Sequence, residues 1–314
     1  MGIMAEGAHV NEAAIGQPAE PLRPFIAYYS GYRQAGIEPA EHRGLPSPYL
    51  TLIFTLDQPL TIAEHPDPRQ PAADYVTLVG GLHTTPALVT HDGSQSGVQL
   101  GLSPLGARAI LGVPAGELAI LDFDGSDVLG KFATEVHERI REAGTWPDRF
   151  EVLDKLFCER LQRLGEGAPG RARAGGARAG GAPCGGFGIS PEVEYSWRRL
   201  LATGGAMPIS ALVTETGWSD RHLRNAFGSE IGLTPKAAAR VVRFHRARLT
   251  LQRRAGAGQR LDLAELAAGC GYYDQAHLDL EFRSLAGSAP TTWLAREFRN
   301  FQAAAQAPEE GLLV

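Results

Sequence analysis

The chain has 314 residues, of which 44% are hydrophobic, and a formal net charge of −5, so it is long enough for two domains with real cores. No apolar run approaches the ~18–20 residues that cross a bilayer, the N-terminus lacks the pattern of a secretory signal, and three scattered cysteines without a CxxC pair support neither a disulfide framework nor a zinc site. The composition therefore predicts a cytoplasmic protein with no membrane contact, no metal and no cofactor.

The N-terminal part of the chain has a β pattern. We expect residues 1–22 to form a disordered leader and residues 23–164 to form a sensor or dimerisation domain. Short apolar or alternating runs such as Tyr49–Leu56 lie between Pro24 and Leu102, separated by Pro, Gly and Asp clusters. Runs at this spacing predict a small antiparallel β-barrel or sandwich, a fold that commonly encloses a small ligand.

Polar residues of this region give little sign of catalysis. Its histidines are His42, His65, His83 and His91, and they lack the spacing of a metal site, so we expect them at the surface. Asp122 and Asp124 are interpreted as capping and turn residues rather than as a general acid and base. The sequence has neither a nucleophile elbow nor a phosphate-binding loop.

The period becomes helical from about Pro104. Leu129–Ala143 and Phe150–Leu164 are predicted amphipathic helices, which either cover the barrel or form a dimer interface. Residues 165–189, composed almost entirely of Gly, Ala, Arg and Pro, are predicted to be a flexible linker. Its r.m.s. span would be about 25–30 Å, which would let the following domain reorient.

Residues 190–302 are expected to form an all-α domain, followed by a disordered tail over residues 303–314. Residues 191–302 carry 15 Lys+Arg against 11 Asp+Glu, whereas residues 1–164 carry 12 against 21. The basic charge therefore lies at the C-terminal end, as in a nucleic-acid-binding module attached to an acidic domain. Thr234 and Pro235 open a long basic helix that is predicted to reach about Arg254.

Two segments of this domain repeat one pattern of a helix, a glycine-containing turn and a second helix. Gly217 supplies the turn within Ile209–Pro235, and Gly271 supplies it within Leu261–Pro290. The residues that stand 55 positions apart in the two segments are Leu223 and Leu278, Phe227 and Phe282, Gly232 and Gly287, and Pro235 and Pro290. This repeat indicates a duplicated helix-turn-helix, whose second helix lies in the DNA major groove.

The second segment resembles the second helix-turn-helix of the AraC/XylS family of bacterial transcription regulators, whose usual signature is G-[FY]-x-[DS]-Q-x-H-F-x-R-x-F followed by G-x-[ST]-P. Leu278 replaces the usual Phe, Leu280 the usual Arg, and Ala289 the usual Ser or Thr. The matching residues are Gly271, Tyr272, Asp274, Gln275, His277, Phe282, Gly287 and Pro290.

This resemblance covers roughly residues 190–300. It implies a transcription regulator rather than an enzyme, with a cupin-like β-barrel sensor before the DNA-binding domain. The run GVQLGLSPLGARAILGVPAGEL also resembles the distal part of a sensor region found in one subgroup of such regulators. The implied partner is double-stranded DNA, and RNA polymerase, a small-molecule effector at the N-terminal domain and a second copy of the chain are candidate further partners.

The first recognition helix, Ser219–Ser229, carries chemistry suited to reading bases. Arg221, Arg224 and Asn225 lie opposite a buried side formed by Leu223, Ala226 and Phe227, and Ser219 caps the helix end that would face a phosphate. Arginine pairs bidentately with guanine and asparagine pairs with adenine.

The second recognition helix is chemically poorer. Ala276, Asp279 and Leu280 take the places of the three base-facing residues, and acidic residues, including Glu281, outnumber Arg283. We therefore expect the first unit to supply most of the base specificity. The predicted DNA contacts of both units are Ser219, Arg221, Arg224, Asn225, Arg243, Arg246, Gln275, His277, Asp279 and Arg283.

Two alternatives remain at this stage. The duplicated motif could be an appendage of an enzyme, as in DNA-repair methyl acceptors, which would need an activated cysteine. It could also be a degenerate DNA-binding part in a ligand-binding protein, which would lack the steep salt dependence of true phosphate contacts.

Overall fold

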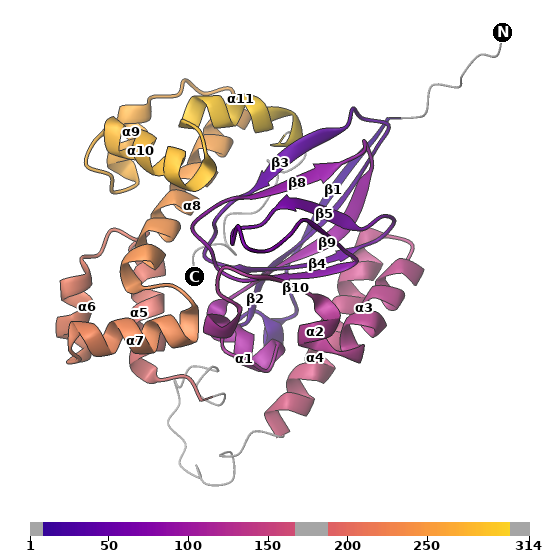
Figure 1. Cartoon of the computed structure of the whole chain (residues 1–314), viewed down its shortest axis with the longest axis horizontal. Helices are drawn as coiled ribbons and strands as arrows, with labels where there is room; N and C mark the ends of the chain where they lie inside the picture. The colour runs from indigo at the N-terminus through magenta and orange to yellow at the C-terminus, as the bar shows by residue number, and fades with distance from the viewer. Residues whose placement is uncertain (1–8, 167–187, 302–314) are drawn as a thin grey trace.

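The computed structural model describes residues 9–166 and 188–301 (Figure 1). Its N-terminal part is built on two antiparallel sheets with the strand orders β1-β2-β9-β4-β7-β10 and β3-β8-β5-β6. The strands are β1 (Val10–Gly16), β2 (Ile26–Ala35), β3 (Ala40–Gly44), β4 (Leu50–Thr55), β5 (Leu60–Glu64), β6 (Ala73–Tyr75), β7 (Thr77–Gly80), β8 (Ala87–His91), β9 (Gln95–Leu102) and β10 (Asp122–Asp124).

The two sheets form an open sandwich, not a closed barrel, because the described strands of one sheet do not pair with those of the other. Strand β4 is buried on both faces, as a central strand covered on two sides should be. Ile53 packs in the smaller apolar cluster with Leu60 and Val89 of the second sheet, whereas Leu52 and Phe54 belong to the main core. The sandwich that the strand spacing predicted is thus confirmed.

Strand β1 lies inside the segment that we expected to be a disordered leader. Its residues pair with β2 in continuous register, from Val10 opposite Ala35 to Gly16 opposite Tyr29. The prediction of disorder was therefore wrong from this strand onward, while residues 1–8 lie outside the described part. The strand sequence VNEAAIG mixes apolar, small and polar side chains without an alternating apolar face, and the strand pairs with β2 through backbone bonds.

Helices cover the outer face of the larger sheet. They are α1 (Ala107–Ile110), α2 (Gly125–Leu129), α3 (Lys131–Glu142) and α4 (Trp146–Glu166), with short 3-10 helices η1 (Glu20–Leu22), η2 (Pro104–Gly106) and η3 (Ala115–Leu118). Phe132 and Phe157 are buried and meet edge to face at 5.2 Å, and Phe150 stacks on Tyr29 of β2 at 5.7 Å. The apolar sides of α3 and α4 are thus buried within this chain, as the covering interpretation predicts. Within the described residues, none of the helices is long and apolar enough to cross a membrane.

The C-terminal part is helical, as predicted. Its helices are α5 (Pro191–Ala202), α6 (Ile209–Thr216), α7 (Asp220–Ile231), α8 (Pro235–Gly256), α9 (Leu263–Gly269), α10 (Gln275–Ala286) and α11 (Pro290–Phe301). Both turn glycines have positive φ, 70° at Gly217 and 80° at Gly271, which explains why the turns need glycine. Helix α8 joins the two helix-turn-helix units (Figure 1).

The N-terminal part packs directly against α7. Arg108 of α1 forms a bidentate ion pair with Glu230, with Nε–Oε2 and Nη2–Oε1 distances of 2.8 and 2.7 Å. At Gly116 of η3 a Cβ atom would lie only 2.1 Å from the carbonyl oxygen of Ser229, so the backbones are in close contact. The two parts are therefore in direct contact in this structure, and the reorientation expected of the C-terminal domain stays a prediction. Most of the predicted linker, residues 167–187, lies outside the described residues.

Candidate nucleic-acid interface

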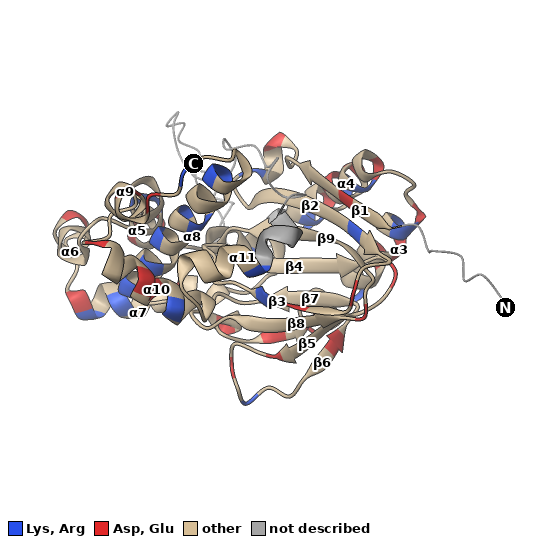
Figure 2. Ribbon diagram, turned by 90° about the horizontal axis from the view of Figure 1, so that it is seen from above, with Lys and Arg blue, Asp and Glu red and all other residues tan. Residues whose placement is uncertain are grey.

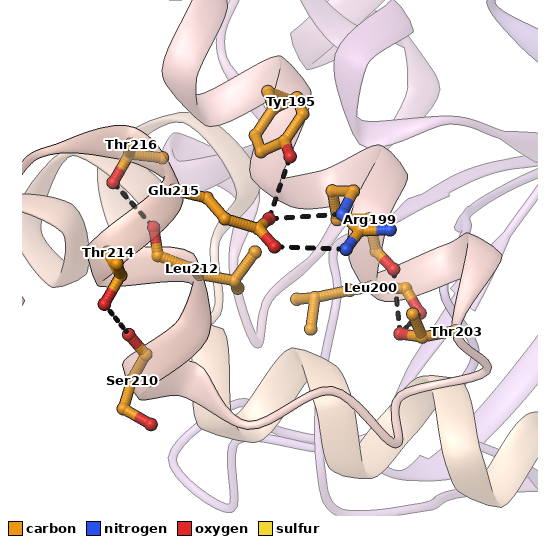
Figure 3. Close-up of polar contacts among 9 residues, drawn as sticks. All are labelled: Tyr195, Arg199, Leu200, Thr203, Ser210, Leu212, Thr214, Glu215 and Thr216. Atoms are coloured by element: carbon orange, nitrogen blue, oxygen red, sulfur yellow. Dashed lines mark hydrogen bonds and ion pairs between the residues drawn. The ribbon is translucent and has the colours of Figure 1, made fainter.

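Helix α5 holds the first helix-turn-helix in place (Figure 3). The carboxylate of Glu215 on α6 accepts hydrogen bonds from Arg199, with Nε and Nη2 both at 3.2 Å, and from the Tyr195 hydroxyl at 2.8 Å. The bonds from Arg199, which contribute most, and the bond from Tyr195 together lower the pKa of Glu215 below its usual value. These bonds join α5 to α6, the first helix of the unit.

Helix α7 has the two sides that its sequence predicted. Ser219 is the N-cap, and its hydroxyl accepts a bond from the His222 backbone N–H at 3.2 Å. Leu223 and Phe227 are fully buried, whereas Arg221, Arg224 and Asn225 are exposed. The structure thus brings these three side chains together on one free surface.

The Arg224 guanidinium is paired with Asp220, one turn earlier on the same helix. The Nη2–Oδ2 distance is 2.6 Å and both side chains are more than half exposed. Exposed pairs of this kind contribute only about 0.3–0.5 kcal/mol, so a guanine or a phosphate can displace Asp220.

The second recognition helix, α10, is capped and packed like the first. Asp274 accepts a bond from the His277 backbone N–H at 2.8 Å, and Phe282 packs on Phe244 of α8 with ring centroids 4.9 Å apart. His277 Nδ1 accepts a bond from the Tyr273 backbone N–H at 3.3 Å. His277 therefore orders the turn before α10, while Gln275 and Arg283 are exposed, as predicted.

Two acidic residues of α10 are placed differently from the sequence expectation. Arg240 of α8 donates from Nε to both carboxylate oxygens of Glu281 at 3.0 Å and from Nη2 to the Ser284 hydroxyl at 3.3 Å. Asp279 is half-buried, and its Oδ1 atom is buried with no hydrogen-bond partner among the described residues. Glu281 was therefore wrongly counted as a charge facing DNA, because its carboxylate is paired with Arg240. The sequence did not indicate this pair, since the two residues are 41 positions apart and meet only through tertiary packing.

Arg243 and Arg246 of α8, which were predicted to contact DNA, have neighbours within the chain. Arg243 donates from Nη2 to the Gly205 carbonyl at 3.1 Å and lies over the Tyr272 ring at 5.5 Å. Arg246 lies so close to Gly204 that a Cβ atom there would be 2.7 Å from Nη1. Arg243 is thus bonded to the turn after α5, and Arg246 packs against that turn. Figure 2 shows that basic residues nonetheless recur along α7 and α8.

A cavity of about 1110 Å³ lies between the sheets and reaches helices α8, α9 and α11. Its walls include apolar residues of both sheets, namely Ile53, Leu60, Ile62, Leu78 and Val89. Polar groups at the junction with α8 include Tyr28, His42, Gln99, His245 and Arg248. Sequence reasoning missed this polar set, because its members come from four elements far apart along the chain.

The cavity histidines are held neutral. Burial, reinforced by nearby His91, lowers the pKa of His42 to about 4. Burial, reinforced by Arg248, lowers the pKa of His245 well below its usual value. Arg248 and His245 lie 3.2 Å apart through Nη2 and Nδ1. The cavity therefore combines an apolar interior with permanent cations at its junction with α8, where Arg248 lies next to His245.

Other predicted residues of the sandwich have structural partners. His65 is buried and its Nδ1 lies 2.8 Å from Asp122 Oδ2, so the expectation of a surface histidine was wrong there. Asp124 caps α2 by accepting a bond from the Ser126 N–H at 2.8 Å, as predicted. Among the described residues, none of the His, Cys, Asp and Glu side chains gather in a group of three that could hold a metal ion.

Comparisons with known proteins agree with this architecture. The family model described as a helix-turn-helix domain matches residues 212–296, and a domain of unknown function (DUF6597) matches residues 15–122. The first match confirms the predicted AraC-type helix-turn-helix domain, a DNA-binding module of transcription regulators. The search of curated proteins gave no match.

Three solved structures are similar to the chain at low identity. ToxT from Vibrio cholerae O395 has a TM-score of 0.48 and 11% identity, covering 85% of this chain and 96% of that one. Unsaturated fatty acid bound ToxT from Vibrio cholerae strain SCE256 has a TM-score of 0.47 and 8% identity, covering 94% and 98%. The C-terminal domain of AraT, a response regulator from Geobacillus stearothermophilus, has a TM-score of 0.30 and 17% identity, covering 38% and 91%.

Proposed function

We propose that the chain is a sequence-specific transcription regulator in which α7 and α10 enter successive major-groove segments on one face of DNA. The observation that carries this proposal is the pair of capped recognition helices joined by α8. That helix has 22 residues, a length of about 33 Å, close to the ~34 Å of one turn of B-DNA.

Base recognition falls mainly to α7. Its exposed residues Arg221, Arg224 and Asn225 can donate to guanine and pair with adenine, and the exposed pair with Asp220 gives way at little cost. The N-terminus of α7, capped by Ser219, adds a backbone site for a phosphate.

Measuring the affinity of the chain for a duplex selected from a randomised pool tests this assignment. The purified full chain is used to select duplexes from a randomised pool, and affinities are measured at several salt concentrations. Arg224→Ala should weaken specific binding by about 1–3 kcal/mol, whereas Asp279→Ala should change it little or improve it. A larger loss at Asp279 than at Arg224, or no salt dependence, would overturn the proposal.

The N-terminal domain is proposed to control this activity through a small molecule in the cavity. Because α8 forms part of the cavity's lining, an occupant would touch the DNA-binding part directly. Apolar walls, two neutral histidines and Arg248 suit an apolar molecule that carries an acidic group.

Fluorescence provides a test of this control, because Trp293 lines the same cavity. Titration with decanoate should change the emission of the wild type, and Arg248→Met should weaken the effect more than it weakens the response to decanol. An equal response of both proteins to both compounds would exclude a role for the cation. RNA polymerase and a second copy of the chain stay predicted partners.

The enzyme alternative is not favoured by the thiols. A methyl-acceptor cysteine needs a lowered pKa to form a thiolate. Burial instead raises the pKa of Cys158 and of Cys270. Cys184 lies outside the described residues.

A further inference from the structure

We propose that the exposed face of α10 recognises thymine by apolar contact, with Ala276 and Leu280 against the 5-methyl groups in the major groove. The inference rests on the proposed DNA-binding function and assigns a base class to its second recognition helix.

The first observation is an exposed apolar surface on a helix that otherwise buries its apolar residues. Leu280 is 65% exposed and Tyr273, in the turn before α10, is 92% exposed. Leu278 and Phe282, two residues to either side of Leu280, are fully buried. Since neighbours two apart point in different directions on a helix, Leu280 lies on the side opposite the core.

The second observation concerns three polar side chains beside this face, two of which are bonded within the chain and one of which is partly buried. Glu281 is held by Arg240, and Asp279 turns one carboxylate oxygen inward. The Nδ1 atom of His277 accepts a bond from the backbone N–H of Tyr273. Ala276 and Leu280, four residues apart and both exposed, are what remains at the centre of the surface.

The internal repeat indicates that this surface faces bases. Leu280 stands 55 positions after Asn225, and Ala276 stands 55 positions after Arg221, so they occupy the places of two of the three exposed base-facing residues of α7, and Asp279 occupies the third. Helices α7 and α10 are both capped by a side chain at the turn and both end at a glycine with positive φ. A surface presented by the same local fold is expected to meet the same partner, which is DNA rather than a protein.

The chemistry of the groove then selects the base. Thymine carries the one apolar group on the major-groove edge, its C5 methyl, and small apolar side chains contact it. Guanine, adenine and cytosine would instead set acceptors or donors against Leu280, which would leave them unpaired. The exposed Tyr273 hydroxyl and Arg283 flank the face and are placed to bind phosphates, which fixes the helix on the duplex without reading sequence.

Replacing thymine by deoxyuridine removes only the methyl group and tests this directly. Each thymine of the selected duplex is replaced in turn, and affinities are measured for the wild type, Leu280→Ala and Leu280→Arg. Val76→Ala is the matched control, because it shortens an exposed apolar side chain (44% exposed) in the N-terminal domain. Thermal unfolding verifies that each variant folds.

We expect deoxyuridine at one or two positions of one half-site to weaken wild-type binding about fourfold per methyl, which corresponds to ~0.8 kcal/mol. Leu280→Ala should lose a similar factor on the thymine duplex and become insensitive to those replacements, and Val76→Ala should behave as the wild type. Leu280→Arg should shift the preference at that position towards guanine.

Three results would overturn the inference. One is a wild type that binds every deoxyuridine duplex as well as the thymine duplex. Another is a Leu280→Ala variant that folds and binds the thymine duplex with wild-type affinity, which would show that the face does not contact the bases. A failure to select any duplex would instead reject the proposed function as a whole, and the inference with it.

Discussion

Removing the Arg108–Glu230 ion pair should loosen the contact between the N-terminal domain and α7. The pair is bidentate, at 2.8 and 2.7 Å, and its side chains are 32% and 16% exposed. It is therefore better shielded than an exposed pair, which contributes ~0–1 kcal/mol, and hydrogen bonds to charged groups contribute roughly 1.5–3 kcal/mol. We expect a coupling of about 1–2 kcal/mol between the two side chains.

A double-mutant cycle measures this coupling. Arg108→Ala, Glu230→Ala and the double variant are unfolded in urea and followed by tryptophan fluorescence, and the free energies of unfolding are compared. The double variant should be about as unstable as the worse single variant. The pair Arg254–Glu265, in which Glu265 is 66% exposed, is the control and should show coupling below about 0.5–1 kcal/mol. Additive effects at Arg108 and Glu230 would refute the reasoning.

Three further predictions concern the same surfaces. Asp220→Asn should raise DNA affinity about twofold in a binding titration, because it frees the Arg224 guanidinium from a pair contributing about 0.3–0.5 kcal/mol; unchanged or weaker binding would contradict this. Gly116→Ala should lower the midpoint of thermal unfolding, since its Cβ atom would lie 2.1 Å from the Ser229 carbonyl oxygen. Gly144→Ala, with nothing within 4 Å of the added Cβ atom and no positive φ, is the control, and an equal fall in both variants would contradict this. In the folded chain the pKa of His42 is lowered from 6.5 to about 4, so the unfolded chain binds the proton first as the pH falls. The free energy of unfolding should therefore decrease as the pH drops from about 6.5 towards 4. His42→Gln should lose less stability than the wild type over that range, and an equal loss would exclude His42 as a cause.

The parts of the fold that the sequence predicted well depend on local interactions. Caps such as those of Ser219 and Asp274 join atoms three residues apart, and the turn glycines are required by backbone geometry at a single position. The buried stripes of α7 and α10 follow from helical periodicity. A duplicated set of such signals made the C-terminal domain recognisable without its tertiary structure.

The parts that escaped prediction depend on distant contacts. The partner of Glu281 lies 41 residues away and that of Glu230 lies 122 residues away, so neither pair leaves a local pattern. Strand β1 has no alternating apolar side, and only its backbone pairing with β2 identifies it as a strand. The cavity likewise arises only when the two sheets and α8 are brought together, and the sequence shows its lining as scattered, unrelated residues.

Hydroxyl-radical footprinting of the full chain on a selected duplex tests the central claim most directly, because it reports where both recognition helices meet DNA. Two protected segments on one face of the duplex, about 10–10.5 base pairs apart, are expected. Arg224→Ala should weaken the protection of one segment more than that of the other. A single protected segment, or protection that does not follow any sequence, would contradict the account of two helix-turn-helix units reading successive major-groove segments.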